Sequence, residues 1–268
     1  MSRHIVRHLR KVDPVLGGVI RAAGPYRPAP EAGCEPFQIL AQAIAHQQLN
    51  GTAANTILGR LVASCGEGGS FPTPQQVLAA PVEQLRAAGF SFAKVAALKD
   101  LASKSLDAVV PDRAALERLD DAAIIERLTQ VRGVGRWTVE MLLMFHLGRP
   151  DVLPVDDFGV RAGFRAAYGL RKLPHPRALA AWGERWKPHR SAAAWYLWRA
   201  LELSRAGTLP APAAPVRLPR VAKRRRAAAK KRRVRVAGAA SARPRRSGAR
   251  TRARRRRAAP PRAPASRK

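Results

Sequence analysis

Apolar residues recur at intervals of three and four along most of the chain, a spacing that places them on one face of an α-helix. The segment 36–49 shows this pattern through Phe37, Leu40 and Ile44, and the segment 52–65 repeats it. The same spacing predicts further helices at residues 73–80, 81–88, 92–106, 120–131, 136–147, 157–168, 175–186 and 191–206. Convincing alternation of apolar and polar positions is absent from the sequence, so we expect an all-α fold.

Turn and capping residues separate these predicted helices by short loops. Thr73 and Ser91 precede helical runs as N-caps, and Gly89 and Gly148 follow two others. Most of the helices are too short to be stable alone. We therefore expect a bundle in which they are stabilised by packing against one another.

The basic residues are distributed unevenly over the 268 residues, whose formal net charge is +32. Residues 210–268 contain 23 Lys and Arg, no Asp or Glu and no aromatic residue, so this segment cannot bury a core. We expect it to be a disordered tail. Residues 1–209 hold the other 27 basic residues and all 18 acidic ones, and their length suits a folded body.

Both parts of the chain are positive, which indicates a polyanionic partner. Nucleic acid is the first choice, because Lys and Arg displace counterions condensed on phosphates. The two cysteines, Cys34 and Cys65, exclude a disulfide framework and a four-cysteine zinc or iron–sulfur site. The N-terminus has no apolar signal region and no apolar run is long enough to span a membrane. We expect a cytoplasmic protein with no membrane partner.

The segment "LTQVRGVGRWTVEMLLMF", residues 128–145, predicts two helices joined by a tight turn. Gly133 and Gly135 permit positive φ and a close backbone approach, while Val134 between them is expected to pack inward. The unpaired N–H groups that begin the second helix form a site for an anion such as a phosphate. Arg132 and Arg136 add positive charge. The alternative interpretation is a plain turn between two helices.

Two adjacent carboxylates, Asp156 and Asp157, follow in "LPVDDFGVRAGF", residues 153–164. Aspartate is a preferred helix N-cap, and a cap alone would explain this pair. The other interpretation is that one of the two carries chemistry.

Several motifs occur together in one order: "FQILAQAIAHQQL" (37–49), "FPTPQQVLAA" (71–80), "GFSFAKVAALKDLA" (89–102), "GVGRWT" (133–138), "VDD" (155–157) and "ERWKPHRSAAAWYLW" (184–198). Over residues 30–206 the chain resembles the helix–hairpin–helix DNA glycosylase superfamily, and within it the AlkA-like DNA-3-methyladenine glycosylase II enzymes. The resemblance implies a two-lobed helical bundle over residues 1–209. The tail, 210–268, has no counterpart in the family pattern.

The resemblance implies a monofunctional DNA N-glycosylase without a cofactor. Such an enzyme flips alkylated bases of the 3-methyladenine and 7-methylguanine type out of duplex DNA. It then hydrolyses the N-glycosidic bond and leaves an abasic site. Asp157 matches the catalytic carboxylate, and Asp156 is left to cap or orient. Trp137 stands where the bifunctional branch has its lysine nucleophile, so no lyase activity is expected. Two alternatives stay open: a non-enzymatic, nucleoid-associated DNA-binding protein, and a glycosylase for oxidised or deaminated bases.

By the same resemblance, Trp137 and Trp198 are the aromatic residues of the base pocket, and Met141 occupies a third pocket position. Packing in the core is the alternative for both tryptophans. Gln48 matches the wedge that fills the gap left by the flipped base, unless Gln47 and Gln48 simply form the exposed end of a helix. The other three tryptophans are interpreted as packing residues: Trp182, Trp186 and Trp195.

Three further expectations concern ions, the tail and assembly. The family's hairpin often binds a monovalent cation through backbone carbonyls, here near Val131 and Gly133, while the side chains indicate no metal site. The tail is expected to bind DNA phosphates without regard to sequence, with RNA binding or nuclear import as alternatives. We expect a monomer that acts on the DNA of a bacterial nucleoid.

Overall fold

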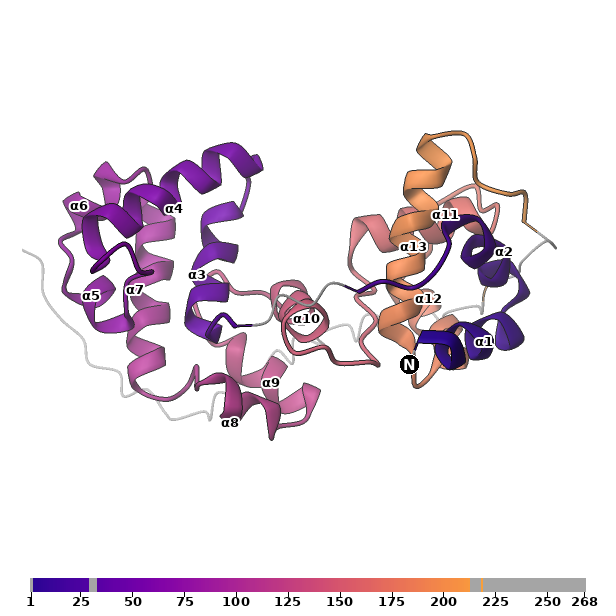
Figure 1. The fold of residues 1–268 in the computed structure, drawn as a ribbon, viewed down its shortest axis with the longest axis horizontal. Helices are drawn as coiled ribbons and strands as arrows, with labels where there is room; N and C mark the ends of the chain where they lie inside the picture. Colours follow the sequence, from indigo (N-terminus) through magenta and orange to yellow (C-terminus); the bar gives the residue numbers. More distant parts are fainter. Residues whose placement is uncertain (1, 29–32, 213–217, 219–268) are drawn as a thin grey trace, which may run out of the picture. The chain divides into compact units, whose positions relative to one another are not determined.

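Helices form all the regular secondary structure of residues 2–28, 33–212 and 218, which are the residues that the computed structural model describes (Figure 1). They are α1 (Ser2–Val12), α2 (Pro14–Ala23), α3 (Pro36–His46), α4 (Gly51–Cys65), α5 (Pro74–Ala79), α6 (Val82–Ala87), α7 (Phe92–Leu106), α8 (Arg113–Glu117), α9 (Asp121–Leu128), α10 (Arg136–Phe145), α11 (Phe158–Ala167), α12 (Pro176–Gly183), the 3-10 helix η1 (Glu184–Trp186) and α13 (Arg190–Arg205). The predicted tail lies almost wholly outside these residues. None of the described helices is long and apolar enough to cross a membrane.

The helices expected from the sequence are present, and three more accompany them. None of α1, α2 and α8 was predicted from the sequence. Polar residues dominate α1, α2 contains two adjacent glycines, and α8 is only 5 residues long. The repeat in α8 is too short to stand out, whereas the helical spacing of Ile5, Leu9 and Val12 in α1 and of Val15 and Val19 in α2 was an available signal that was missed.

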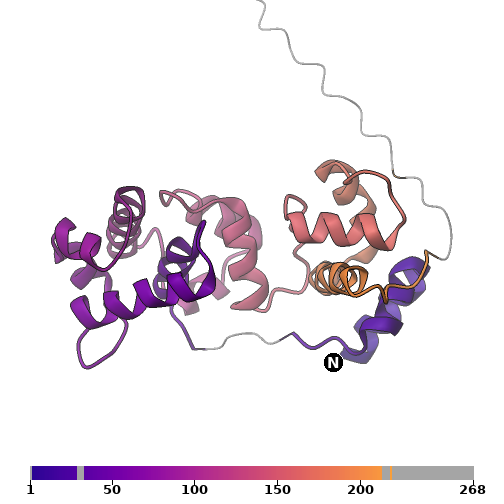
Figure 2. The same cartoon turned by 90° about the horizontal axis from the view of Figure 1, so that it is seen from above.

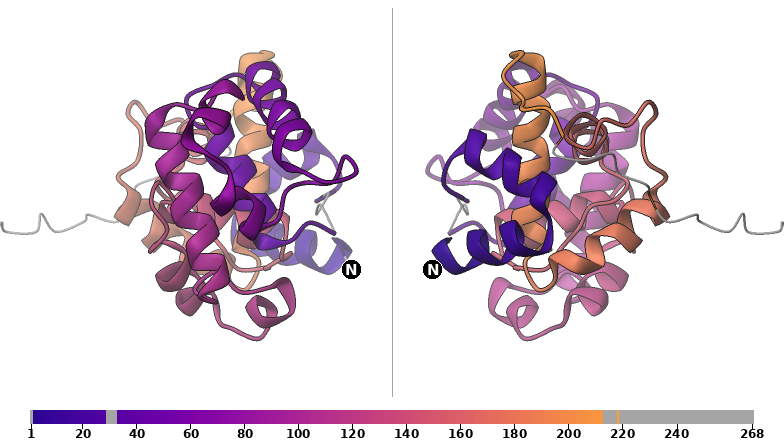
Figure 3. Two further views of the ribbon diagram at one scale, coloured as in Figure 1. Left: turned by 90° about the vertical axis from the view of Figure 1, so that its left-hand side faces the viewer. Right: turned by 90° about the vertical axis from the view of Figure 1, so that its right-hand side faces the viewer.

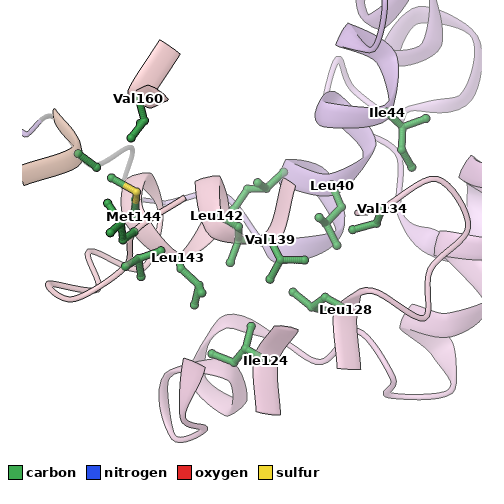
Figure 4. Packing of buried hydrophobic residues seen from close by; sticks show 14 of the residues in the cluster. Leu40, Ile44, Ile124, Leu128, Val134, Val139, Leu142, Leu143, Met144 and Val160 are labelled. Atoms are coloured by element: carbon green, nitrogen blue, oxygen red, sulfur yellow. The ribbon is translucent and has the colours of Figure 1, made fainter. Parts of the chain in front are cut away.

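One group of helices is built from the middle of the chain (Figures 1 and 2). In it α3 packs against α4, α7 and α10, while α5 and α6 pack against α7, and α9 packs against α10. The inward faces bury aliphatic side chains such as Leu40 of α3 and Leu128 of α9. Val134, from the turn before α10, is buried in the same core cluster (Figure 4). The turn is therefore anchored from inside, as expected.

A second group combines the two ends of the described chain (Figure 3). The long helix α13 packs against α11 and α2, while α1 contacts α2 and η1. The two groups correspond to the two lobes that the resemblance implied. The hairpin belongs to the first group and the Asp156–Asp157 pair begins α11 of the second.

A buried carboxylate joins the elements of the second group. Asp13 is only 1% exposed and caps α2 by accepting a hydrogen bond from Leu16 N (3.1 Å). Its Oδ2 accepts three more, from Tyr168 Oη (2.6 Å), Trp182 Nε1 (3.0 Å) and Trp186 Nε1 (3.0 Å). Burial and the nearby Asp13 raise the pKa of Tyr168 well above its ordinary value. Trp182 and Trp186 are thus packing residues, as predicted, with an added polar role.

Candidate active site

The hairpin turn uses the positive φ that its sequence permits at Gly133 but not at Gly135, which is extended with a φ of −94°. Gly133 has a φ of 77°, in the left-handed region that glycine enters without strain, and Val134 N donates to Val131 O (3.0 Å). Gly135 is the N-cap of α10 and offers no side-chain cap. The first N–H groups of α10, beginning at Arg136, therefore lack a capping side chain, which is the arrangement that binds anions at helix N-termini.

Helix α7 holds this turn through Asp100, which was not singled out from the sequence. Asp100 Oδ2 accepts a hydrogen bond from Arg132 N (2.7 Å) and forms an ion pair with Lys104 Nζ (2.8 Å). Lys104 Nζ also donates to Gln130 O (2.5 Å). Burial alone would raise the pKa of Asp100, but the hydrogen bonds from the Arg132 amide and Lys104 outweigh it and lower the pKa. Two side chains of α7 thus fix the backbone just before the glycines.

Asp157 is the N-cap of α11 and the acceptor of two indole N–H groups. Its Oδ1 accepts from Val160 N (2.6 Å) and Trp198 Nε1 (2.9 Å), and its Oδ2 accepts from Trp137 Nε1 (2.8 Å). Asp156 is exposed and does not cap the helix, so the capping role expected for it was wrong. The cap and the candidate catalytic carboxylate are the same residue. Three N–H donors from α10, α11 and α13 fix the orientation of its carboxylate plane.

Two glycines one turn apart on α11 let it approach α13 closely. A Cβ on Gly163 would lie 1.8 Å from the carbonyl oxygen of Leu197. A Cβ on Gly159 would lie 2.7 Å from Cδ1 of Trp198 and 3.1 Å from Oδ1 of Asp157. Residues at i and i+4 share one face of a helix, so both glycines face α13. The Gly-x-x-x-Gly spacing was the available sequence signal for this contact, and it was missed.

A cleft of about 720 Å³ collects three of the predicted residues. Trp137, Met141 and Gln48 line it, from α10 and from the segment between α3 and α4. Trp198 does not line this cleft. Its ring lies against Phe145, with centroids 5.7 Å apart, and its N–H faces Asp157. Trp137 belongs to both places, because the residue is 49% exposed and lines the cleft while its indole N–H donates to the Asp157 carboxylate.

The candidate wedge stands in an unusual backbone conformation. α3 ends at His46, and Gln48 follows with a φ of 58° and an exposed side chain. Its neighbour Gln47 is not free in solvent: Gln47 Nε2 donates to Gly133 O (2.8 Å). The segment that carries Gln48 is therefore tied directly to the hairpin turn. A wedge role for Gln48 stays a prediction.

A buried carboxylate lies on the hairpin helix beside these groups. Glu140 is 3% exposed and accepts from Arg136 Nε (2.8 Å), whose own side chain is 63% exposed. Burial raises the pKa of Glu140, against the lowering effect of Arg136, and the charges of Asp156 and Asp157 raise it further. Part of the positive charge expected at Arg136 is thus offset from within the protein. The i, i+4 spacing of the pair was the signal that sequence reasoning missed.

The predicted cation position is not tested by these contacts. The Gly133 carbonyl already accepts from Gln47, and the Val131 carbonyl accepts from Val134 N. Each carbonyl oxygen has two lone pairs, so these hydrogen bonds leave room for a further ligand interaction. Among the described residues, no group of His, Cys, Asp and Glu is arranged to bind a metal ion.

Taken together, the glycine turn, the open N-terminus of α10 and the capped carboxylate of α11 define a helix–hairpin–helix protein with a candidate site at a helix start. Residues 41–189 match the family described as HhH-GPD superfamily base excision DNA repair protein. The chain belongs to this superfamily.

Relatives with known names and solved structures agree with this assignment. DNA-3-methyladenine glycosylase 1 of Schizosaccharomyces pombe is 41% identical over 198 residues, which cover 74% of this chain and 86% of that protein. The structure of the 3-methyladenine DNA glycosylase from the same organism, in complex with abasic DNA, aligns with a TM-score of 0.66 and 41% identity over 73% of this chain and 95% of that one. A DNA-3-methyladenine glycosidase from Bacillus halodurans aligns with a TM-score of 0.69 and 33% identity over 75% and 91%.

Proposed function

We propose that the protein is a monofunctional DNA N-glycosylase that releases alkylated bases of the 3-methyladenine and 7-methylguanine type and leaves an abasic site. The observation that carries this proposal is the Asp157 carboxylate, held by the N–H groups of Trp137, Trp198 and Val160 at the start of α11. The names of the relatives support the substrate class. Capping of α11 explains the hydrogen bond from Val160 N, but a cap alone does not require the two indole N–H groups that also hold this carboxylate.

The chemistry needs a negative group at this place. As the bond between the base and C1′ of the deoxyribose breaks, its electrons leave with the base and positive charge develops on the sugar. The fixed Asp157 carboxylate stabilises that charge with little rearrangement. It also orients a water molecule, whose oxygen bonds to C1′ while its proton passes to the carboxylate.

Base recognition follows from the exposed indole. A base inside the duplex must first be rotated out of the stack. The Trp137 ring is anchored by its N–H, and the half-exposed residue lines the cleft, so in this proposal its ring stacks on a flipped base. A purine nucleotide alkylated at ring nitrogen N3 or N7 is cationic, and a cation over an indole gains about 0.5–2 kcal/mol. Met141, in the same cleft, supplies a soft and adaptable wall.

The remaining predicted groups bind the DNA backbone. In this proposal the N–H groups of Gly133, Gly135 and the first turn of α10 receive a phosphate, with Arg132 and Arg136 near it. Val134, whose N–H donates to Val131 O, holds the turn from inside. Gln48 fills the space of the flipped base. The basic tail adds contacts that do not depend on sequence. Its removal lowers affinity for undamaged duplex without changing the rate of base release at saturating enzyme. The protein acts as a monomer.

A single exchange tests the catalytic assignment. Asn caps helices about as well as Asp, so Asp157→Asn keeps the cap of α11 but removes the charge. Loss of such stabilisation costs about 10²–10³ in rate. We expect a drop of this size in single-turnover base release on duplexes with one lesion each. Asp156→Asn, at the exposed neighbour, is the matched control and keeps the wild-type rate.

The same assay separates the competing functions. Full base release by Asp157→Asn would falsify the mechanism. If the wild-type protein binds DNA but releases no base from a panel of alkylated, oxidised and deaminated lesions, the non-enzymatic alternative is correct. Borohydride treatment during turnover distinguishes the bifunctional mechanism, because only a Schiff base with the sugar is trapped as a covalent complex, and we expect none.

A further inference from the structure

A groove on the first helix gathers three arginines that the proposed reaction does not use. Arg3, Arg7 and Arg10 of α1 line a hollow of about 400 Å³, with Tyr26 at its edge. All three arginines are exposed. Residues spaced by four and three share one face of a helix, so the guanidinium groups extend along about 10 Å of the α1 axis.

In the part of the chain that the structure describes, none of these three arginines has a carboxylate partner, in contrast to five other arginines of the folded body. Among the described residues, none of the three forms an ion pair within 4.0 Å. Elsewhere arginines do pair with carboxylates: Arg113, Arg136, Arg149, Arg190 and Arg199. Like charges at i, i+4 repel one another, so the row destabilises α1 unless an anion is bound.

The direction of the helix adds to this repulsion. The first turn of α1 contains no acidic residue, and Arg3 lies there beside the positive end of the helix dipole. Arg10 and Lys11 in the last turn are explained by the dipole alone. Arg3 is not, because a free helix favours negative charge at its start, and Arg7, in the middle of the helix, gains nothing from either end. An anion in the groove removes both the dipole conflict and the repulsion between the side chains.

The opposite face of α1 is occupied by the protein itself. Leu9 is fully buried, and the rings of His4 and His8 contact His189, with centroids 5.4 and 5.3 Å apart. An interfacial helix needs a free apolar face to enter a membrane, and α1 has none to offer. The exposed face is therefore suited to a polyanion in water rather than to lipid.

We propose that the α1 groove is a second phosphate-binding surface that contacts duplex DNA away from the hairpin. A DNA strand rises about 3.4 Å per phosphate, so about 10 Å of helix axis faces about three phosphates, one for each arginine. This inference rests on membership of a DNA repair superfamily and not on base release. Its partner is the DNA backbone of any sequence.

The test is the salt dependence of binding by the full-length protein. The triple variant Arg3→Gln, Arg7→Gln, Arg10→Gln is compared with wild type on an undamaged duplex by fluorescence anisotropy at several salt concentrations. Each phosphate contact contributes about 0.9 to the slope of log affinity against log salt, so the loss of three lowers the slope by about 2.7. An unchanged slope overturns the proposal. The readout needs no base release, so a catalytically inactive protein still reports on the groove.

Two matched variants exclude trivial causes. Arg118, Arg165 and Arg205 are exposed and form no ion pair among the described residues. Arg118 is the C-cap of α8, while Arg165 and Arg205 lie on α11 and α13, so their joint exchange to Gln makes the same charge change outside the groove. We expect a clearly smaller slope change from this control. Exchanging the three α1 arginines for Lys keeps the charge and restores most of the slope. Equal loss in both glutamine variants shows that only net charge matters and refutes a specific surface.

Anionic lipid is the competing source of phosphate. Co-sedimentation with phosphatidylserine vesicles is measured for wild type and the α1 glutamine variant, with helical content checked by circular dichroism. We expect no vesicle binding that depends on the three arginines. Vesicle binding that the variant loses, together with an unchanged DNA slope, assigns the groove to a membrane and overturns the proposal.

Discussion

Replacing Gly159 by alanine adds one methyl group beside the candidate catalytic carboxylate. The new Cβ would lie 2.7 Å from Cδ1 and 2.8 Å from Nε1 of Trp198, and 3.1 Å from Oδ1 of Asp157. Ordinary contact begins near 3.4 Å, so the indole must move by at least about 0.7 Å. The hydrogen bond from Trp198 Nε1 to Asp157, 2.9 Å long, lies directly beside the added group. We expect this bond to be broken or badly bent.

The expected effects on stability and on activity differ in size. Loss of a hydrogen bond to a charged group costs about 1.5–3 kcal/mol. Alanine is favoured over glycine within a helix by about 1 kcal/mol, which offsets part of that cost. A displacement near 1 Å of a catalytic group, in contrast, costs about 10²-fold in rate. Gly159→Ala should therefore fold nearly as well as wild type while losing most of its base release.

The assay is single-turnover base release from a duplex with one 7-methylguanine, alongside thermal unfolding followed by circular dichroism. Gly59→Ala is the control, because Gly59 is an exposed position of α4 and a Cβ there meets nothing within 4 Å. It should gain a little stability and keep the full rate. A wild-type rate in Gly159→Ala would show that the contact between Trp198 and Asp157 does not position the carboxylate.

Three further predictions concern groups outside the reacting carboxylate. Asp13→Ala leaves the buried Tyr168 hydroxyl and the indole N–H groups of Trp182 and Trp186 without an acceptor. The free energy of unfolding in urea should therefore fall by about 3–5 kcal/mol. A loss below about 1 kcal/mol would contradict the role of Asp13 in joining the helices. Asp100→Asn removes the charge that holds the Arg132 amide and Lys104, and we expect up to about tenfold weaker DNA binding by anisotropy with an unchanged rate at saturation. Burial raises the pKa of Glu140 above its usual 4.5, so the folded state binds this proton more tightly than the unfolded state. The stability that this bound proton contributes is complete below pH 4.5 and is lost as the pH rises through the raised pKa of Glu140. Because Gln cannot ionise, the melting temperature of Glu140→Gln should rise relative to that of wild type across this pH range. A difference in melting temperature that does not vary with pH would refute this.

The parts of the fold that sequence predicts are those set by neighbouring residues. The helix expected at 92–106 has those bounds because its apolar spacing, the Ser91 cap and its last turn are all local. The hairpin is likewise local, since Gly133 takes the positive φ of the turn and Gly135 is the N-cap at which α10 begins. Local rules failed where two residues satisfy the same rule. Either Asp156 or Asp157 could cap α11, and only the path of the chain decides between them.

The rest depends on contacts between distant segments. Asp13 meets Tyr168 across 155 positions, and Gln47 meets Gly133 across 86. No periodicity or spacing in either segment reports such a pairing. The burial of Glu140 has the same origin, because a carboxylate on a helix is interpreted as exposed until a neighbouring element covers it. Sequence reasoning therefore names candidate residues for the chemistry but does not find the residues that hold them in place.

The contact at Gly163 has a consequence for how the protein tolerates change over time. There α11 touches the main chain of α13 at Leu197 rather than a side chain. The separation of the helices that bear Asp157 and Trp198 is therefore set by backbone atoms, which are the same whatever amino acids occupy the interior around them. Aliphatic substitutions elsewhere in that lobe can accumulate without altering this spacing. Gly163 itself is the position where even one added carbon would push the pair apart.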